Sequence, residues 1–335
     1  MPDVDHEIIS LPAPRSVSFS KEVRPILNNR CVVCHGCYDA PCQLKLSSYE
    51  GLERGASKSV VYDGARLNPV EPTRLFVDAK SKKEWRSKGF YSVLNESSHE
   101  SYRDNLEKSV FYRMIQMKQR QPQPRTGAVA KELGPNLNRQ NYCPTQEELP
   151  HFMEQHSNWG MPFGLPNLTE REYETLVLWL AQGAQTDQKA TLLKKAERKS
   201  LNAWEQLLNQ KDLKSQLISR YLYEHLFLAH IQFVQFDKRR FYRLVRSRTP
   251  SGNPVDEIAT VRPYDSPGVG ALYYRFVEES SAIVAKNHLV YKLGPQTYKR
   301  WKSLFYDKDF QVTALPSYDV DQASNPFRTF TQIPA

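Results

Sequence analysis

Residues 28–43, NNRCVVCHGCYDAPCQ, contain four cysteines and a histidine in close succession. Cys31, Cys34 and His35 form the pattern C-x-x-C-H. In this pattern two thiols become thioethers to a haem, and the histidine is the proximal ligand of the haem iron. The sequence therefore predicts a covalently attached haem c that is held by these three side chains.

Two other metal sites compete for the same thiols. A zinc site would use all four cysteines, but structural zinc sites usually take two C-x-x-C pairs that lie well apart in the sequence. An iron–sulfur site with the pattern C-x-x-C-x-x-C-x-x-x-C-P has one residue fewer before its last cysteine, and its proline follows that cysteine. Here Pro41 precedes Cys42. Both interpretations fit less well than haem.

The haem interpretation also suggests how the remaining cysteines are used. With Cys31 and Cys34 bound to haem, Cys37 and Cys42 are close enough in the sequence for a short disulfide, which would suit an oxidising compartment. We expect Cys143, far from the cluster, to be incidental.

A sixth ligand to the iron is predicted at Met161, in the motif Gly-Met-Pro, where Pro162 would hold the backbone extended. Met114 lies on an apolar helix face, so core packing explains it better. His151 and His156 are the main competitors, together with an open sixth position. Further candidate ligands are Met117, Met153 and His99.

Two helical segments would hold such a group. Apolar residues at helical spacing predict a short amphipathic helix that leads into Cys31. After Met161, Thr169 and Glu172 predict a capping box, and Gly183 ends the amphipathic helix that follows. This pair of segments resembles the beginning and the end of a class I cytochrome c domain.

The predicted fold class is mainly α with an α+β part. We expect a cytochrome c-like haem domain over residues 15–185, interrupted by a long insertion of mixed structure at about 46–141. Residues 190–335 are predicted to form a helix-plus-antiparallel-strand region that is incomplete at its C-terminus. Hydrophobic periodicity predicts the elements of these regions: a strand at 73–79, helices at 105–119, 201–209 and 213–233, a basic hairpin at 236–265, two strands within 271–293, and a closing helix from Pro295.

The amino-acid composition limits the classes of partner and of reaction that we expect. The chain of 335 residues has a formal net charge of +9, which favours anionic partners such as lipid head groups. No apolar run is long enough to cross a bilayer, and no signal peptide is visible in this numbering. A Gly-rich phosphate loop, a G-x-S-x-G elbow and an H-E-x-x-H motif are all missing from the sequence. Any catalysis is therefore expected to depend on the haem.

Four stretches, at residues 23–58, 73–94, 220–233 and 241–265, resemble the bacterial fatty acid cis/trans isomerases. The resemblance implies a periplasmic enzyme with haem c that converts cis double bonds to trans in the acyl chains of membrane phospholipids, as an adaptation to solvent or heat stress. The positive charge and the Trp, Tyr and Phe residues of a protein that does not cross the membrane favour peripheral contact with anionic head groups, and we expect no nucleic-acid partner. Family members are longer and carry an export signal, so we expect this chain to be partial and to show little activity alone.

The alternative is a periplasmic c-type cytochrome, an electron carrier with an appended region that docks a partner. In an isomerase, a ferric haem could weaken a double bond by withdrawing an electron and then returning it. An isomerase would change the cis/trans ratio without added reductant, whereas a carrier would leave lipids unchanged.

Overall fold

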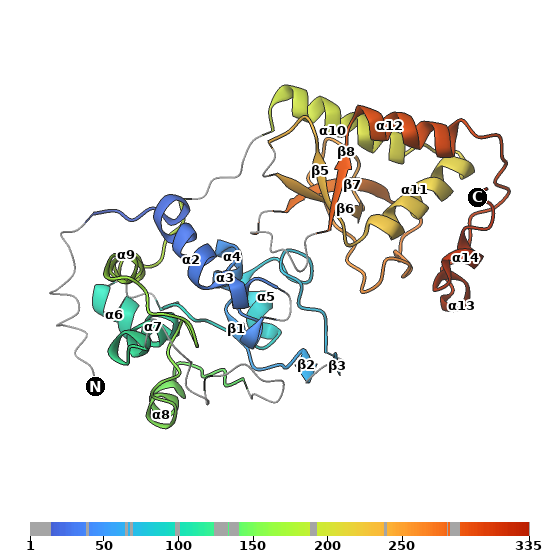
Figure 1. The fold of residues 1–335 in the computed structure, drawn as a ribbon. Helices are drawn as coiled ribbons and strands as arrows, with labels where there is room; N and C mark the ends of the chain where they lie inside the picture. The colour runs from blue at the N-terminus through green and yellow to red at the C-terminus, as the bar shows by residue number, and fades with distance from the viewer. Residues whose placement is uncertain are drawn as a thin grey trace. The chain divides into compact units, whose positions relative to one another are not determined.

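The structure is a computed structural model that describes residues 15–37, 40–63, 66–67, 70–97, 101–123, 133, 141–187, 193–237, 240–279, 281 and 289–334. The chain divides near residue 190 into two compact units, and Ser281 belongs to the first of them. Each unit has its own hydrophobic core. The mainly α-helical fold with an α+β part agrees with the predicted fold class (Figure 1).

The first unit is built from short helices and two small two-stranded sheets. In chain order its elements are η1 (Phe19–Val23), α2 (Arg24–Arg30), α3 (Val32–His35), η2 (Pro41–Gln43), α4 (Tyr49–Arg54), β1 (Ala56–Ser57), β2 (Tyr62–Asp63), β3 (Arg66–Leu67), α5 (Lys82–Ser87), β4 (Phe90–Tyr91), α6 (Tyr102–Glu107), α7 (Val110–Arg120), α8 (Leu149–Gln155) and α9 (Glu170–Ala181). Strand β1 pairs with β4, and β2 pairs with β3, both antiparallel.

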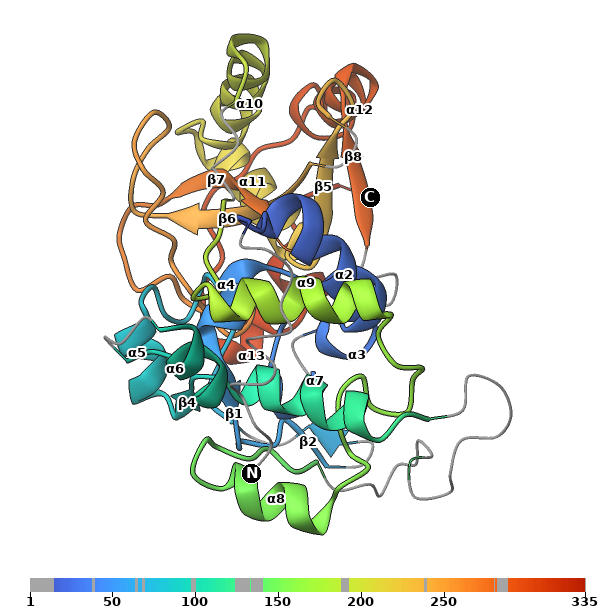
Figure 2. The same ribbon diagram turned by 90° about the vertical axis from the view of Figure 1, so that its left-hand side faces the viewer.

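Helix α9 forms the centre of this unit. Its predicted capping box is confirmed, because the Thr169 hydroxyl accepts from the Glu172 backbone N–H while the Glu172 carboxylate accepts from the Thr169 N–H. The helix ends at Ala181, two residues before Gly183, which has the positive φ of +85° typical of a helix stop. Its apolar residues are buried almost all round, and Figure 2 shows α9 lying between α2 and α7.

Two elements of the first unit differ from the predictions. Residues 73–79 form a turn, not a strand, because Asp78 accepts hydrogen bonds from the backbone N–H and the guanidinium of Arg74. The helix expected at 105–119 is two helices, α6 and α7. Ser109 separates them, since its hydroxyl accepts from the Tyr112 N–H and caps α7.

The second unit combines helices with one four-stranded sheet. Its elements are α10 (Lys195–Leu208), α11 (Leu213–Leu226), β5 (His230–Phe233), β6 (Phe241–Ser247), β7 (Tyr273–Glu279), β8 (Val290–Leu293), α12 (Pro295–Trp301), η5 (Lys302–Tyr306), α13 (Val320–Ala323) and α14 (Pro326–Thr329). The strand order is β7-β6-β5-β8, and only the β5–β8 pair is parallel. Helices α10, α11 and α12 pack their apolar residues against this sheet.

The predictions for the second unit hold in part. Strands β7 and β8 and the helix from Pro295 are confirmed. The helix expected at 213–233 stops at Leu226, because the last residues pair with β6 and β8 as strand β5. Within the expected hairpin at 236–265, the described residues form a single β-bridge between Ser247 and Glu257. Strand β6 instead pairs along its whole length with β7.

Three arginines in or beside the basic strands are paired with carboxylates within this unit. Arg240 pairs with Glu278 at 2.7 Å, and Arg275 pairs with Glu205 at 2.9 Å. Arg243 contacts two carboxylates, and all three arginine side chains are largely buried. These arginines therefore contribute little free positive charge to the surface. None of the helices in the described ranges is long and apolar enough to cross a membrane.

Candidate haem site

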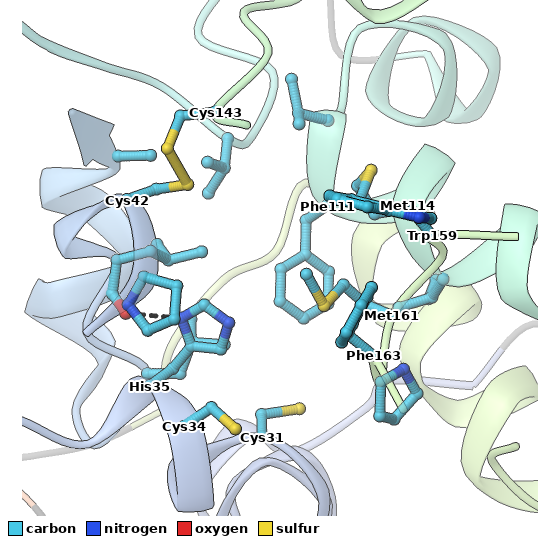
Figure 3. Close-up of a pocket in the computed structure, with 18 of the residues that line it drawn as sticks. Cys31, Cys34, His35, Cys42, Phe111, Met114, Cys143, Trp159, Met161 and Phe163 are labelled. Carbon is cyan, nitrogen blue, oxygen red and sulfur yellow. Dashed lines mark hydrogen bonds between the residues drawn. A yellow bond between two sulfur atoms is a disulfide. The ribbon is translucent and has the colours of Figure 1, made fainter. Parts of the chain in front are cut away.

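His35 closes the single turn of α3 and points into a cavity of the first unit (Figure 3). Its Nδ1 lies 2.9 Å from the Leu44 carbonyl oxygen, which can only accept, so Nδ1 carries the proton and Nε2 keeps its lone pair. Burial lowers the pKa of His35, which favours the neutral ring. A neutral imidazole with one oriented nitrogen and one free nitrogen is the form that binds a metal.

Cys31 lies one helical turn before His35, and Cys34 directly precedes it. The His35 N–H donates to the Cys31 carbonyl at 2.9 Å, so the turn brings all three side chains to one edge of the cavity. Both thiols are free, and burial raises the pKa of Cys31 to about 12. Thiols that are not joined to each other are available for thioether bonds.

Met161 lies on the opposite wall, where its thioether faces His35 in Figure 3. Its backbone N–H donates to the Met114 carbonyl at 2.9 Å, which ties this segment to α7. A Cβ at Gly160 would collide with the backbone of Lys118, so only glycine allows the close approach. The segment is a bend with a cis Met161–Pro162 bond, not the extended run that we expected.

The cavity between these walls has a volume of about 380 Å³, within the range of small-molecule and cofactor sites. Helix α3 and the loop after it form one wall, and α7 with residues 141–168 forms the other. Aromatic side chains dominate the second wall: Phe111, Tyr142, Phe152, Trp159 and Phe163. Sequence reasoning did not include these rings in the site, although Trp159 and Phe163 stand directly beside Gly-Met-Pro.

The competing sixth ligands lie in other surroundings. His151 is exposed on α8, and His156 stacks between Tyr142 and Trp159 with ring centroids 4.7 Å from each. Neither histidine lines the cavity. Met114, in α7, does line the cavity, whereas Met117 and Met153 pack in the core. His99 lies outside the described residues.

The disulfide pairing differs from the prediction. Cys42 is joined to Cys143, with Cα atoms 5.5 Å apart, while Cys37 is a buried free thiol. The expected Cys37–Cys42 bond was wrong, and so was the view of Cys143 as incidental. Both cysteines line the cavity. The disulfide therefore connects the loop beyond His35 to the segment that leads to the Met161 wall.

Arg30 links the C-x-x-C-H helix to α9. Its guanidinium donates to both carboxylate oxygens of Glu172, at 3.0 and 2.9 Å. Burial opposes ionisation of Glu172, but the hydrogen bonds from Arg30 and Thr169 outweigh it and lower the pKa of this carboxyl. The two segments predicted to begin and end the haem domain are thus joined by an ion pair beside the cavity.

The donor set fits a haem better than a bare metal ion. One imidazole nitrogen and one thioether face each other across an apolar cavity, with two free thiols at its edge. A four-thiolate zinc site would need Cys42, which the disulfide occupies. Within the described part of the chain, no three His, Cys, Asp or Glu side chains converge as they would around a metal ion.

Comparison with known proteins adds the family. A family model described as fatty acid cis/trans isomerase (CTI) matches residues 70–335, well over half of the chain. The chain therefore belongs to the fatty acid cis/trans isomerase family, and it is an enzyme of this class. The match includes Met161 and the aromatic wall but not Cys31, Cys34 and His35. No curated protein and no solved structure matches the chain.

Proposed function

We propose that this isomerase binds haem c in the cavity of the first unit and uses it to convert cis double bonds of acyl chains to trans. His35 and Met161 would hold the haem iron, and Cys31 and Cys34 would form the thioethers. The observation that carries the proposal is the pair of His35 and Met161 on opposite walls of one apolar cavity, with two free thiols beside it.

Bound there, a ferric haem would supply reversible one-electron withdrawal from a double bond, and a His/Met pair would favour it by raising the reduction potential. The side chains have separate tasks. The Leu44 carbonyl holds the His35 ring with Nε2 toward the cavity. The aromatic rings around Met161 exclude water and offer an apolar surface to a hydrocarbon chain.

The proposed substrates are unsaturated acyl chains of membrane phospholipids, whose trans isomers pack more tightly under solvent or heat stress. An apolar cavity suits a hydrocarbon chain, and the family acts on fatty acids. We place the enzyme in the periplasm in peripheral contact with the membrane. The Cys42–Cys143 disulfide supports an oxidising compartment.

The first experiment tests the cofactor. Protein made together with the haem c maturation machinery should give a pyridine haemochrome spectrum and keep its haem through acid-acetone extraction. Cys31→Ala or Cys34→Ala should weaken covalent attachment, and His35→Ala should abolish low-spin ligation. Cys37→Ala, which leaves the motif intact, is the control. Colourless parent protein would contradict the haem proposal.

The second experiment tests the reaction. Protein containing this chain, exported to a periplasm, should convert cis chains of phospholipid to trans chains with the double bond at the same position. No NADH, ATP or hydroquinone should be needed, because the conversion of cis to trans involves no net oxidation or reduction. A need for stoichiometric reductant, or equal yield from His35→Ala, would contradict the mechanism. Haem protein that leaves the lipid unchanged would instead be an electron carrier.

A further inference from the structure

The opening of the cavity is marked by exposed apolar side chains. In the described part of the first unit, the large apolar residues with at least 37% of their surface exposed are Val33, Val60, Tyr102, Tyr142 and Leu165. Val33, Tyr142 and Leu165 also line the cavity, and we call these three residues the rim. The rim is 64%, 47% and 37% exposed, respectively. Three of these five exposed apolar residues therefore line the cavity.

The three rim residues come from separate segments. Val33 lies in α3, between the two cysteines of C-x-x-C-H. Leu165 follows the Met161 segment on the opposite wall, and Tyr142 stands beside the disulfide residue Cys143. The rim thus includes side chains from the wall of His35 and from the wall of Met161.

An apolar path leads inward from the rim. Phe163, two residues before Leu165, packs edge to face against Trp159 with ring centroids 5.3 Å apart, and both rings line the cavity. Trp159 in turn contacts Tyr142 at 5.7 Å. A hydrocarbon chain that enters over the rim would therefore meet the aromatic carbon of these three rings.

Charge limits what can enter. In the described part of the cavity lining, Arg30 alone has a permanent charge, and its Nε and Nη2 both donate to the Glu172 carboxylate. Among the described lining residues a carboxylate or phosphate would therefore meet no unpaired cation, whereas a hydrocarbon chain would meet apolar side chains.

We propose that Val33, Tyr142 and Leu165 form the entry site for a single unsaturated acyl chain, whose polar head stays in solvent while the chain passes over the rim into the cavity. The proposal rests on the proposed function, because it names where the substrate of that same cavity binds. Each rim side chain that becomes buried against a methylene chain contributes through apolar area removed from water.

The test compares rim variants with matched variants elsewhere on the surface. Val33→Asp and Leu165→Asp place a carboxylate on the rim. Val60→Asp and Leu304→Asp change the same residue types at positions that are 52% and 45% exposed and do not line the cavity. Circular dichroism and haem content check that each protein is folded and loaded. If one rim variant does not fold, the other still decides the test.

Binding of oleate, kept below its critical micelle concentration, is measured by calorimetry on the haem-loaded protein. Each rim variant should bind about tenfold more weakly, the effect of losing roughly one buried apolar side chain, whereas the two controls should stay within about twofold of the parent. Val33→Leu, which keeps the rim apolar, should bind as the parent does. Equal affinities for rim and control variants would overturn the proposal.

A second arm identifies the source of the chain. Co-sedimentation with vesicles of dioleoyl phosphatidylcholine should fall for the same rim variants if the chain comes from a membrane. Loss of oleate binding alone would assign the rim to free fatty acid, and both results support an acyl-chain site. Because neither arm requires turnover, rim-dependent binding without isomerisation would contradict only the proposed function. Isomerisation that the rim variants leave unchanged would contradict only the proposal that the rim is the entry site.

Discussion

The two proposed axial ligands are held by different local means. His35 depends on a hydrogen bond to the Leu44 carbonyl, which follows it closely in the sequence. Met161 depends on backbone contacts with α7, where its N–H meets the Met114 carbonyl and Gly160 lies against Lys118. Substitution at either ligand should therefore leave the other in place.

Met161→Ala is expected to remove the near-infrared charge-transfer band between methionine sulfur and ferric iron while the haem stays attached through its thioethers. Absorption spectra of the oxidised protein measure this band. Met153→Ala is the matched control, since Met153 is partly buried but does not line the cavity. A band that survives in Met161→Ala would show that Met161 is not the ligand. If the parent itself has no band, an open sixth position becomes the better assignment.

Lys118 gives a pH-dependent prediction. This residue of α7 is 2% exposed, and its Nζ has no hydrogen-bond partner among the described residues. Burial lowers the pKa of Lys118 from 10.5 to about 8. Between these two pH values the unfolded chain binds more protons than the folded chain, so stability should rise with pH across this window. At neutral pH the folded protein carries the cost of a buried ammonium.

Lys118→Met should therefore raise the free energy of unfolding at neutral pH, by at most about 3 kcal/mol, and flatten its rise between pH 8 and 10.5. Urea unfolding at several pH values measures both effects. Lys83→Met, at an exposed lysine of α5, should change neither. An unaltered pH profile in Lys118→Met would refute the assignment of a lowered pKa to this amine.

At the scale of elements, the disulfide and α7 bring the two walls together. Cys42 lies in η2, two residues before the carbonyl that orients His35, and Cys143 begins the segment that contains α8 and Met161. Helix α7 lines the cavity and also packs in the core against α9. Residues that we expected to form an insertion thus make part of the cavity wall.

The double variant Cys42→Ser/Cys143→Ser should lose about 2–4 kcal/mol of unfolding free energy, because the bond closes a long loop in the unfolded chain. Urea unfolding with and without reductant is the measurement. Reductant should destabilise the parent and Cys37→Ala, which keeps the disulfide, but not the double variant. If reductant affects all three proteins equally, the stabilising bond lies elsewhere.

At the scale of the whole molecule, two cores give the two units separate stabilities. Leu176 is fully buried in the first core, and Leu244 is 2% exposed in the second. Changing either residue to alanine should cost about 2–5 kcal/mol in its own unit. We expect calorimetry to show each variant lowering the midpoint of a different transition. A single transition lowered equally by both variants would contradict separate stabilities.

The sequence by itself determined the features that depend on near neighbours. The C-x-x-C-H pattern needs only one helical turn to bring Cys31, Cys34 and His35 together, and the capping box needs only the four residues from Thr169 to Glu172. The helix from Pro295 and the strands β7 and β8 were also predictable. Four stretches of the chain indicated the family before the family model confirmed it.

Only the tertiary structure decided which distant residues meet. The partner of Cys42 was not predictable, because pairing depends on where the backbone brings two Cα atoms within bonding reach. Strand β5 was mistaken for helix because its pairing with β6 and β8 overrides a local helical pattern. The aromatic wall, the rim and the buried Lys118 likewise depend on packing between segments far apart in the sequence, which periodicity along the chain does not encode.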